Sequence, residues 1–123
     1  MNGTSFSVIV FGTFDGLHEG HRHFLREARA LGTHLTVVLP PDDAVRHLKS
    51  KEPVNTSASR KKALLDSALV DVVLEGDHVV GTWKIFTQVH PDCIALGYDQ
   101  LELKKELETF FGKRQSDDQP KLV

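Results

Sequence analysis

The sequence predicts an α/β protein with a small parallel sheet of about four to five strands and helices on both faces. Short apolar runs rich in β-branched residues alternate along the chain with longer amphipathic segments. The first run, "SVIVF" (7–11), is almost continuously apolar, which is typical of a strand buried on both faces of a parallel sheet. Strand and helix in alternation indicate right-handed crossovers, and hence a Rossmann-like three-layer sandwich.

The segment 19–32 predicts a helix, because apolar residues recur at helical spacing: Phe24, Leu25, Ala28 and Leu31. Gly32 stands at the position that commonly follows a helix end. The run "HLTVVLP" (34–40) predicts a second strand, which two prolines stop. Asp42 is expected to cap a short helix through "DDAVRHL".

The segment "KSKEPVNTSAS" (49–59) has the composition of a loop. Thr56 or Ser57 is expected to cap the helix that follows, "SRKKALLDSAL" (59–69). The run "VDVVLEG" (70–76) predicts the third strand.

A further helix is expected in 79–92, ending at Pro91, because apolar residues again recur at helical spacing: Val80, Trp83, Phe86 and Val89. Trp83 is expected in the core rather than at a ligand. The run "CIALG" (93–97) predicts a fourth strand, and "LELKKELETFFG" (101–112) predicts an amphipathic helix. The closing "KLV" either begins a fifth strand or is a frayed terminus.

A chain of 123 residues is long enough for one core, so we expect a single domain over 1–111 and a polar tail over 112–123. The formal net charge of −2 argues against a general nucleic-acid-binding protein. No run approaches the roughly 20 apolar residues of a membrane span. The single Cys93 lies in an apolar run, which favours a reduced, cytoplasmic setting.

Polar and glycine-rich segments follow each predicted strand: "GTFDGLH" (12–18), "PPDD" (40–43), "EGDH" (75–78) and "GYDQ" (97–100). The carboxyl ends of parallel strands meet at one edge of a sheet, which is where sheets of this kind bind ligands. The segments that precede the strands carry fewer such residues. The sequence therefore predicts one binding site at this edge.

The turn after the first strand has glycines spaced by four, Gly12, Gly16 and Gly20. This spacing fits neither a dinucleotide fingerprint nor a Walker loop. Two explanations stay open at this point. Either the turn needs glycine for a positive φ angle, or the glycines let backbone N–H groups and a helix N-terminus approach a phosphate.

The histidines favour the second explanation. His18 and His21 are three residues apart at the start of the predicted helix, so both can face one concavity and stabilise charge that develops on a phosphate. Simple solvent contacts are the alternative for these side chains. Zinc is a further alternative, but His23 points to another face and no cysteine pair completes a tetrahedral site.

The segment "GTFDGLHEGH" (12–21) resembles the GTFDxxHxGH signature of the HxGH nucleotidyltransferase superfamily, in its cytidylyltransferase-like branch. Glycerol-3-phosphate cytidylyltransferases and archaeal FAD synthases belong to this branch. The resemblance continues through "KSKEP…SRKKALLDS" and "VDVVLEGD" to "HPDCIALGYDQ", and spans about residues 6–111. The last of these stretches is most similar to archaeal FAD synthases.

The resemblance implies transfer of a nucleotidyl group from a nucleoside triphosphate to a phosphate-bearing acceptor, with release of pyrophosphate and with Mg²⁺ as cofactor. ATP as donor and FMN as acceptor are expected first. The alternatives are a CTP-dependent cytidylyltransferase that acts on glycerol 3-phosphate or a similar acceptor, and a nucleotide-binding module without turnover.

The resemblance also assigns roles to residues. His18 and His21 would bind the triphosphate and stabilise charge at the α-phosphate. Asp15 would brace the loop or help to position phosphate and metal, and Gly20 would allow a close approach. The remaining residues expected in the nucleotide site are Gly12, Thr13, Phe14, Arg60, Gly97, Tyr98, Asp99 and Gln100.

A cation is expected on the far side of the phosphates. Lys49 and Lys51 are the catalytic candidates in the loop after the second strand, with Arg60 beside them at the next helix. Lys49 and Lys51 cannot be told apart by spacing. The alternative is that these lysines, with Lys61 and Lys62, form a solvated face.

The segment "GYDQ" follows the fourth predicted strand. Tyr98 can stack on a base or a flavin ring, while Asp99 and Gln100 offer hydrogen-bonding groups. The alternative is a simple turn in which Asp99 caps the next helix.

Members of the branch usually continue with a further strand and a segment that opens a helix and holds the triphosphate, whereas this chain stops at "PKLV". We expect a shortened variant, a piece of a longer chain, or a site that another subunit completes. Loss of that strand would expose a sheet edge, which favours a homodimer.

Overall fold

A computed structural model describes residues 5–49, 54–77, 83–112 and 120–123. Its centre is a five-stranded sheet in the order β3-β2-β1-β4-β5, in which every neighbouring pair is parallel. This arrangement confirms the predicted Rossmann-like α/β class. The strands are β1 (Ser7–Phe11), β2 (His34–Leu39), β3 (Val72–Glu75), β4 (Cys93–Ile94) and β5 (Lys121–Leu122).

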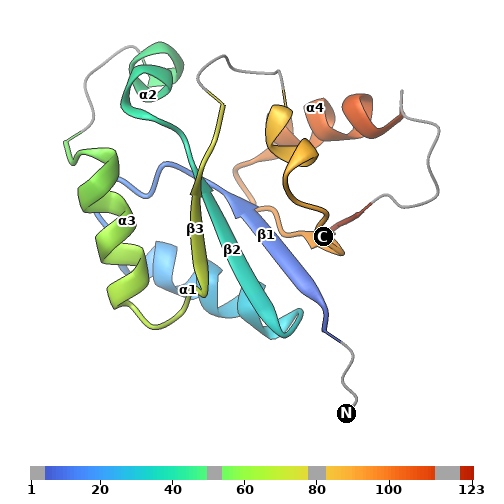
Figure 1. Cartoon of the computed structure of the whole chain (residues 1–123), viewed down its shortest axis with the longest axis horizontal. Coiled ribbons are helices and arrows are strands. Elements are labelled where there is room, and N and C mark those ends of the chain that lie inside the picture. The colour runs from blue at the N-terminus through green and yellow to red at the C-terminus, as the bar shows by residue number, and fades with distance from the viewer. Residues whose placement is uncertain (1–4, 50–53, 78–82, 113–119) are drawn as a thin grey trace.

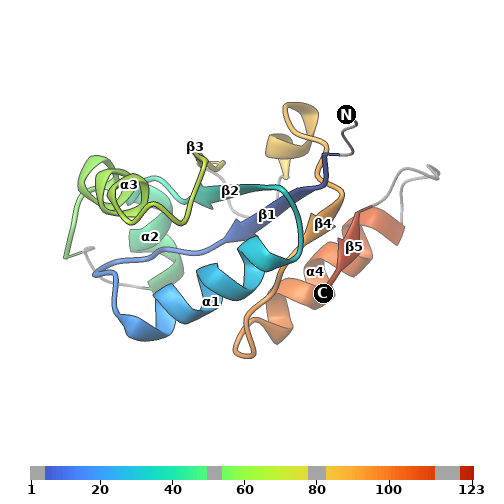
Figure 2. The same cartoon turned by 90° about the horizontal axis from the view of Figure 1, so that it is seen from below.

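Helices cover both faces of the sheet (Figures 1 and 2). One face packs on α1 and α3, and the other packs on α4 and a short 3₁₀ helix, η1. The helices are α1 (Glu19–Ala30), α2 (Asp42–Lys49), α3 (Ser57–Asp66), η1 (Lys84–Thr87) and α4 (Leu101–Gly112). Thr56 caps α3, as predicted, because its hydroxyl accepts a hydrogen bond from the Ser59 N–H.

The central strand β1 is buried on both sides. Val8 and Val10 belong to the core under α1 and α3, whereas Ile9 belongs to the core under η1 and α4. All three are at most 1 % exposed. This confirms the inference that a continuously apolar run marks an interior strand of a parallel sheet.

The prediction of a helix over 79–92 is wrong for residues 83–92, the part of this segment that the structure describes. Within it the only helical element is the single 3₁₀ turn η1. Trp83, directly before that turn, has a left-handed backbone with φ 53°. The turn and its surroundings are rich in β-branched residues, which have low helix propensity: Ile85, Thr87 and Val89. Packing of Trp83 and Phe86 on Phe11 therefore decides the conformation here rather than helical periodicity.

The segment "KLV" forms a strand, so its description as a frayed terminus is wrong. Lys121 and Leu122 pair with Cys93 and Ile94, and the Val123 N–H donates to the Ile94 carbonyl. Figure 2 shows β5 at the end of the chain beside β4. The sheet thus has β3 and β5 at its two edges, and the homodimer expected from an exposed edge stays a prediction.

Candidate active site

A cavity of about 1030 Å³ opens at the carboxyl edge of the sheet, between the loops that follow β1 and β4. This is the point at which the strand order reverses, as expected for a ligand site in such a sheet. The cavity brings together most residues that the sequence singled out. They are Gly12, Thr13, Phe14, Asp15, His18, Gly20, His21, Gly97, Tyr98, Asp99 and Gln100.

The two motif histidines cap helix α1 with their side chains. His18 Nδ1 accepts hydrogen bonds from the N–H groups of Gly20 at 3.0 Å and His21 at 3.4 Å. His21 Nδ1 in turn accepts from the His18 N–H at 3.3 Å. Because Nδ1 is the acceptor in both rings, each neutral imidazole carries its hydrogen on Nε2. The caps therefore select the tautomer that presents an Nε2–H donor.

The imidazole rings of His18 and His21 stack on each other, with centroids 3.7 Å apart and planes 21° apart. The Phe14 ring meets His21 edge to face at 5.2 Å. Both histidines line the cavity at the positive end of the α1 dipole. A group placed there meets two imidazole donors and a helix N-terminus together.

The glycines of the turn serve different purposes. Only Gly16 has a positive φ, +85°. A Cβ on Gly20 would lie 2.9 Å from His18 Cε1, and a Cβ on Gly12 would lie 2.6 Å from Phe14 Cε2. Gly12 and Gly20 thus leave room for the rings that build the site.

Asp15 joins the turn after β1 to the start of the segment before α3. Its carboxylate accepts hydrogen bonds from the Val54 N–H, the Asn55 N–H and the Asn55 side-chain amide, at 2.7, 2.7 and 3.0 Å. Burial by itself raises the pKa of Asp15, but these hydrogen bonds and the charge of Arg60 outweigh it. The pKa of the carboxyl therefore lies below its ordinary value of 3.8.

Replacing Asp15 with asparagine is expected to lower the free energy of unfolding by about 1.5 kcal/mol at neutral pH, because hydrogen bonds to a charged acceptor are lost. A carboxyl whose folded pKa is lowered stabilises the fold above its unfolded pKa, and this contribution declines below pH 3.8 and is lost as the pH falls through the lower folded pKa. Urea unfolding at pH 7 and at pH 3 measures the effect. The difference between wild type and Asp15→Asn should narrow at pH 3, and an equal difference at both pH values would contradict the argument.

Arg60 lies in the first turns of α3 with a fully buried side chain. Its guanidinium donates to the carbonyls of Thr13, Pro40 and Asn55, and to the Asp42 carboxylate at 2.8 Å. The guanidinium therefore ties together the segments that follow β1 and β2. The expected role of Arg60 in nucleotide binding stays a prediction, since its described hydrogen bonds are all internal.

The Asp42 carboxylate does not cap α2, contrary to the sequence-based expectation. Asp42 is already the first residue of that helix, and its side chain binds Arg60. The strong attraction of a buried guanidinium for a nearby carboxylate explains the difference.

The catalytic roles expected of Lys49 and Lys51 remain predictions. Lys49 is the last residue of α2, and its side chain is outside the described part of the structure. Lys51 lies in 50–53, which the structure does not describe.

The "GYDQ" turn is held to β1 by Gln100. Its side-chain oxygen accepts from the Gly97 N–H at 2.8 Å, and its side-chain amide donates to the Phe11 carbonyl at 2.8 Å. Tyr98 is fully exposed at the cavity and is therefore accessible to a planar ligand.

Two features of the site and its surroundings were not anticipated from the sequence. Asn55 supports Asp15, although no spacing rule links residues 40 positions apart. Trp83 has the expected ring contacts with Phe11 and Phe86 in the core, and it also lines the cavity. The one sequence signal that could have placed Trp83 at the cavity is that it follows the third strand, and so lies near the carboxyl edge of the sheet.

The described ranges contain no group of three or more His, Cys, Asp or Glu side chains arranged to hold a metal ion. Within the same ranges, none of the helices has the length and apolar character needed to cross a membrane. Cys93 is buried, and burial raises the pKa of its thiol.

The family model described as Cytidylyltransferase-like matches residues 9–120. An FAD synthase from Thermococcus sibiricus is 39 % identical over 104 residues, which cover 81 % of this chain and 70 % of that protein. An FAD synthase from Aciduliprofundum boonei is 42 % identical over 107 residues, which cover 87 % of this chain and 70 % of that protein.

Two solved structures are similar in fold. The lipopolysaccharide core biosynthesis protein from Thermoplasma volcanium has a TM-score of 0.86 and 33 % identity, with 98 % of this chain and 95 % of that chain covered. A protein of unknown function from Archaeoglobus fulgidus has a TM-score of 0.70 and 20 % identity, with 96 % and 89 % covered. The second likeness concerns the fold alone.

Proposed function

Because the chain belongs to the cytidylyltransferase-like family and is a nucleotidyltransferase, we propose that it transfers the adenylyl group of ATP to the phosphate of FMN. The products are FAD and pyrophosphate. The observation that carries the reaction type is the pair of stacked histidines at the N-terminus of α1. The choice of ATP and FMN rests on the FAD synthases from Thermococcus sibiricus and Aciduliprofundum boonei.

The proposed reaction needs no nucleophile from the protein. An oxygen of the acceptor phosphate attacks the α-phosphorus of the nucleotide, and the bond from that phosphorus to the bridging oxygen of the β-phosphate breaks. Negative charge grows on the phosphoryl oxygens and on the departing pyrophosphate. The Nε2–H donors of His18 and His21 and the positive end of α1 stabilise that charge.

The size of the cavity supports a site for two substrates at once. Pockets for single small molecules are commonly about 300–1000 Å³, and this cavity, at about 1030 Å³, lies just above that range. Tyr98, fully exposed at its margin, offers a face on which a base or an isoalloxazine ring can stack.

Mg²⁺ is proposed as a cofactor that arrives with the triphosphate. The described residues offer no cluster of three ligating side chains, and in such a site phosphate oxygens and water would supply most of its ligands. When bound, the ion would neutralise charge on the triphosphate. The protein residues would orient the α-phosphate.

A CTP-dependent transfer to a small phosphorylated alcohol is the second candidate. The description of the matched family, Cytidylyltransferase-like, favours it. A nucleotide-binding module without turnover is the third.

The three candidate functions can be distinguished by measuring pyrophosphate release in the presence of Mg²⁺. Each nucleotide, ATP or CTP, is combined with each acceptor, FMN or glycerol 3-phosphate. We expect release with ATP and FMN together, and a product that co-elutes with FAD. Release only with CTP would replace the proposal with the second candidate. If calorimetry showed nucleotide binding but no combination of substrates released pyrophosphate, the nucleotide-binding module without turnover would remain.

A further inference from the structure

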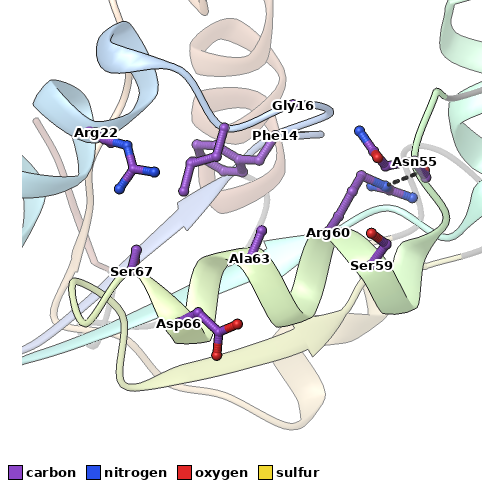
Figure 3. A pocket seen from close by; sticks show the side chains of 10 residues that line it. Phe14, Gly16, Arg22, Asn55, Ser59, Arg60, Ala63, Asp66 and Ser67 are labelled. Atoms are coloured by element: carbon purple, nitrogen blue, oxygen red, sulfur yellow. Dashed lines mark hydrogen bonds between the residues drawn. The ribbon is translucent and has the colours of Figure 1, made fainter.

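A second cavity of about 400 Å³ lies between α1 and α3, behind the turn that carries the active-site residues. Figure 3 shows its lining, with Phe14 between Arg22 on one side and α3 on the other. Phe14 also lines the larger cavity, so its ring is a shared wall between the two. The smaller cavity is lined by Phe14, Gly16, Leu17, Arg22, Asn55, Ser59, Arg60, Ala63, Asp66 and Ser67.

Arg22 is the distinctive group in this cavity. Among the described residues its ion-pair partner is Glu19, whose Oε1 lies 3.7 Å from the Arg22 Nε, which is beyond hydrogen-bonding distance. Arg60 differs from Arg22, because its guanidinium donates hydrogen bonds to three carbonyl groups and to a carboxylate. Arg22 thus brings to the cavity guanidinium donors that are paired loosely with Glu19 and for which the described residues show no hydrogen bond.

The rest of the lining defines which anion fits. Phe14, Leu17 and Ala63 supply apolar surface for a compact body. Asp66 adds a negative charge, which Lys62 partly offsets by binding its carboxylate at 2.7 Å, and the remaining charge repels a dianion more strongly than a monoanion. A single carboxylate matches the planar, forked donors of a guanidinium.

We propose that the cavity between α1 and α3 is a second binding site, which takes a small monocarboxylate with a compact apolar body. The carboxylate binds Arg22, and the apolar body packs against Phe14, Leu17 and Ala63. The volume of the cavity is within the range of small-molecule sites.

The position of Phe14 gives this site a route to the active site. The Phe14 ring contacts His21 edge to face at 5.2 Å, and its backbone is held at φ 48°. Asn55, also in the lining, holds Asp15. A ligand that packs on Phe14 and Asn55 therefore touches the groups that position His21 and Asp15.

Benzoate is a suitable probe, and titration of the isotope-labelled protein by NMR measures its binding. We expect shifts at the amides of residues 14–17, 22 and 63, and the same shifts when ATP is present. Benzyl alcohol, which lacks the charge, and phenyl phosphate, which carries two charges, should bind at least about tenfold more weakly, or about 1.4 kcal/mol.

Arg22→Gln should weaken benzoate binding at least about tenfold, because a charge-assisted pair is lost. Arg26→Gln is the matched control, since Arg26 is exposed one turn later on the same helix. This variant should bind benzoate as tightly as the wild type does. Ala63→Phe, which fills the cavity from α3, should also abolish the shifts.

Three results would overturn the proposal: benzoate binding unchanged in Arg22→Gln, displacement of benzoate by ATP, or shifts absent from residues 14–17 altogether. Each is a binding result, so it is independent of whether pyrophosphate release supports the proposed reaction.

Discussion

Replacing His21 with alanine is expected to lower kcat by about 10²- to 10³-fold, while the domain stays folded. Removal of one preorganised donor from charge that develops in a transition state typically costs about 2.7–4 kcal/mol. His21 lies at the cavity, in a ring stack with His18, and not in the core beneath the sheet. Steady-state kinetics with ATP and FMN, together with thermal unfolding, measures both quantities.

His18 needs a different substitution, because its Nδ1 accepts from two N–H groups in the first turn of α1, whereas the His21 Nδ1 accepts from the His18 N–H. His18→Ala removes the cap as well as the Nε2–H donor, and loss of a cap typically costs about 1 kcal/mol of stability. Asparagine is a good cap but has no group at the position of Nε2. His18→Asn should therefore keep the melting temperature of wild type and still lose about 10²-fold in kcat.

The matched control is His90→Ala, since His90 is exposed and does not line the cavity. It should change neither turnover nor stability. If His18→Asn and His21→Ala kept wild-type turnover, or lost activity only in proportion to unfolding, the two histidines would have a structural role alone.

Arg60→Ala is expected to lower the free energy of unfolding by about 3–5 kcal/mol. The substitution leaves Asp42 without its buried partner and removes the Arg60 donors from three carbonyl groups. Small domains are typically stable by about 5–15 kcal/mol, so this loss is a large fraction of the total. Urea unfolding followed by circular dichroism measures it.

Arg60→Lys should recover little of this stability, because one ammonium group cannot reach the acceptors that the planar guanidinium binds together. Lys61→Ala is the matched control, since Lys61 is the next residue on α3 and is exposed. If Arg60→Ala unfolded like Lys61→Ala and lost only nucleotide affinity, Arg60 would act on the ligand, as the resemblance to nucleotidyltransferases implies.

The candidate site was predictable where its signals are local. The turn after β1, the start of α1 and the spacing of His18 and His21 lie within ten residues of sequence. A buried parallel strand followed by an amphipathic helix places such residues at the carboxyl edge of the sheet. The 3₁₀ turn η1 was not predictable in the same way, because the packing of Trp83 on Phe11 overrides its helical spacing.

The sequence by itself determined the alternation of strands and helices apart from η1, the edge of the sheet at which the cavity lies, and the motif residues His18, Gly20 and His21 that line it. These follow from periodicity and from short-range spacing. Only the tertiary structure decided what Arg60, Gln100 and Asp15 contact. Arg60 reaches Thr13 across 47 positions, and Gln100 reaches Phe11 across 89. Such partners are chosen by the packing of strand ends against one another, and no local pattern of side chains encodes them.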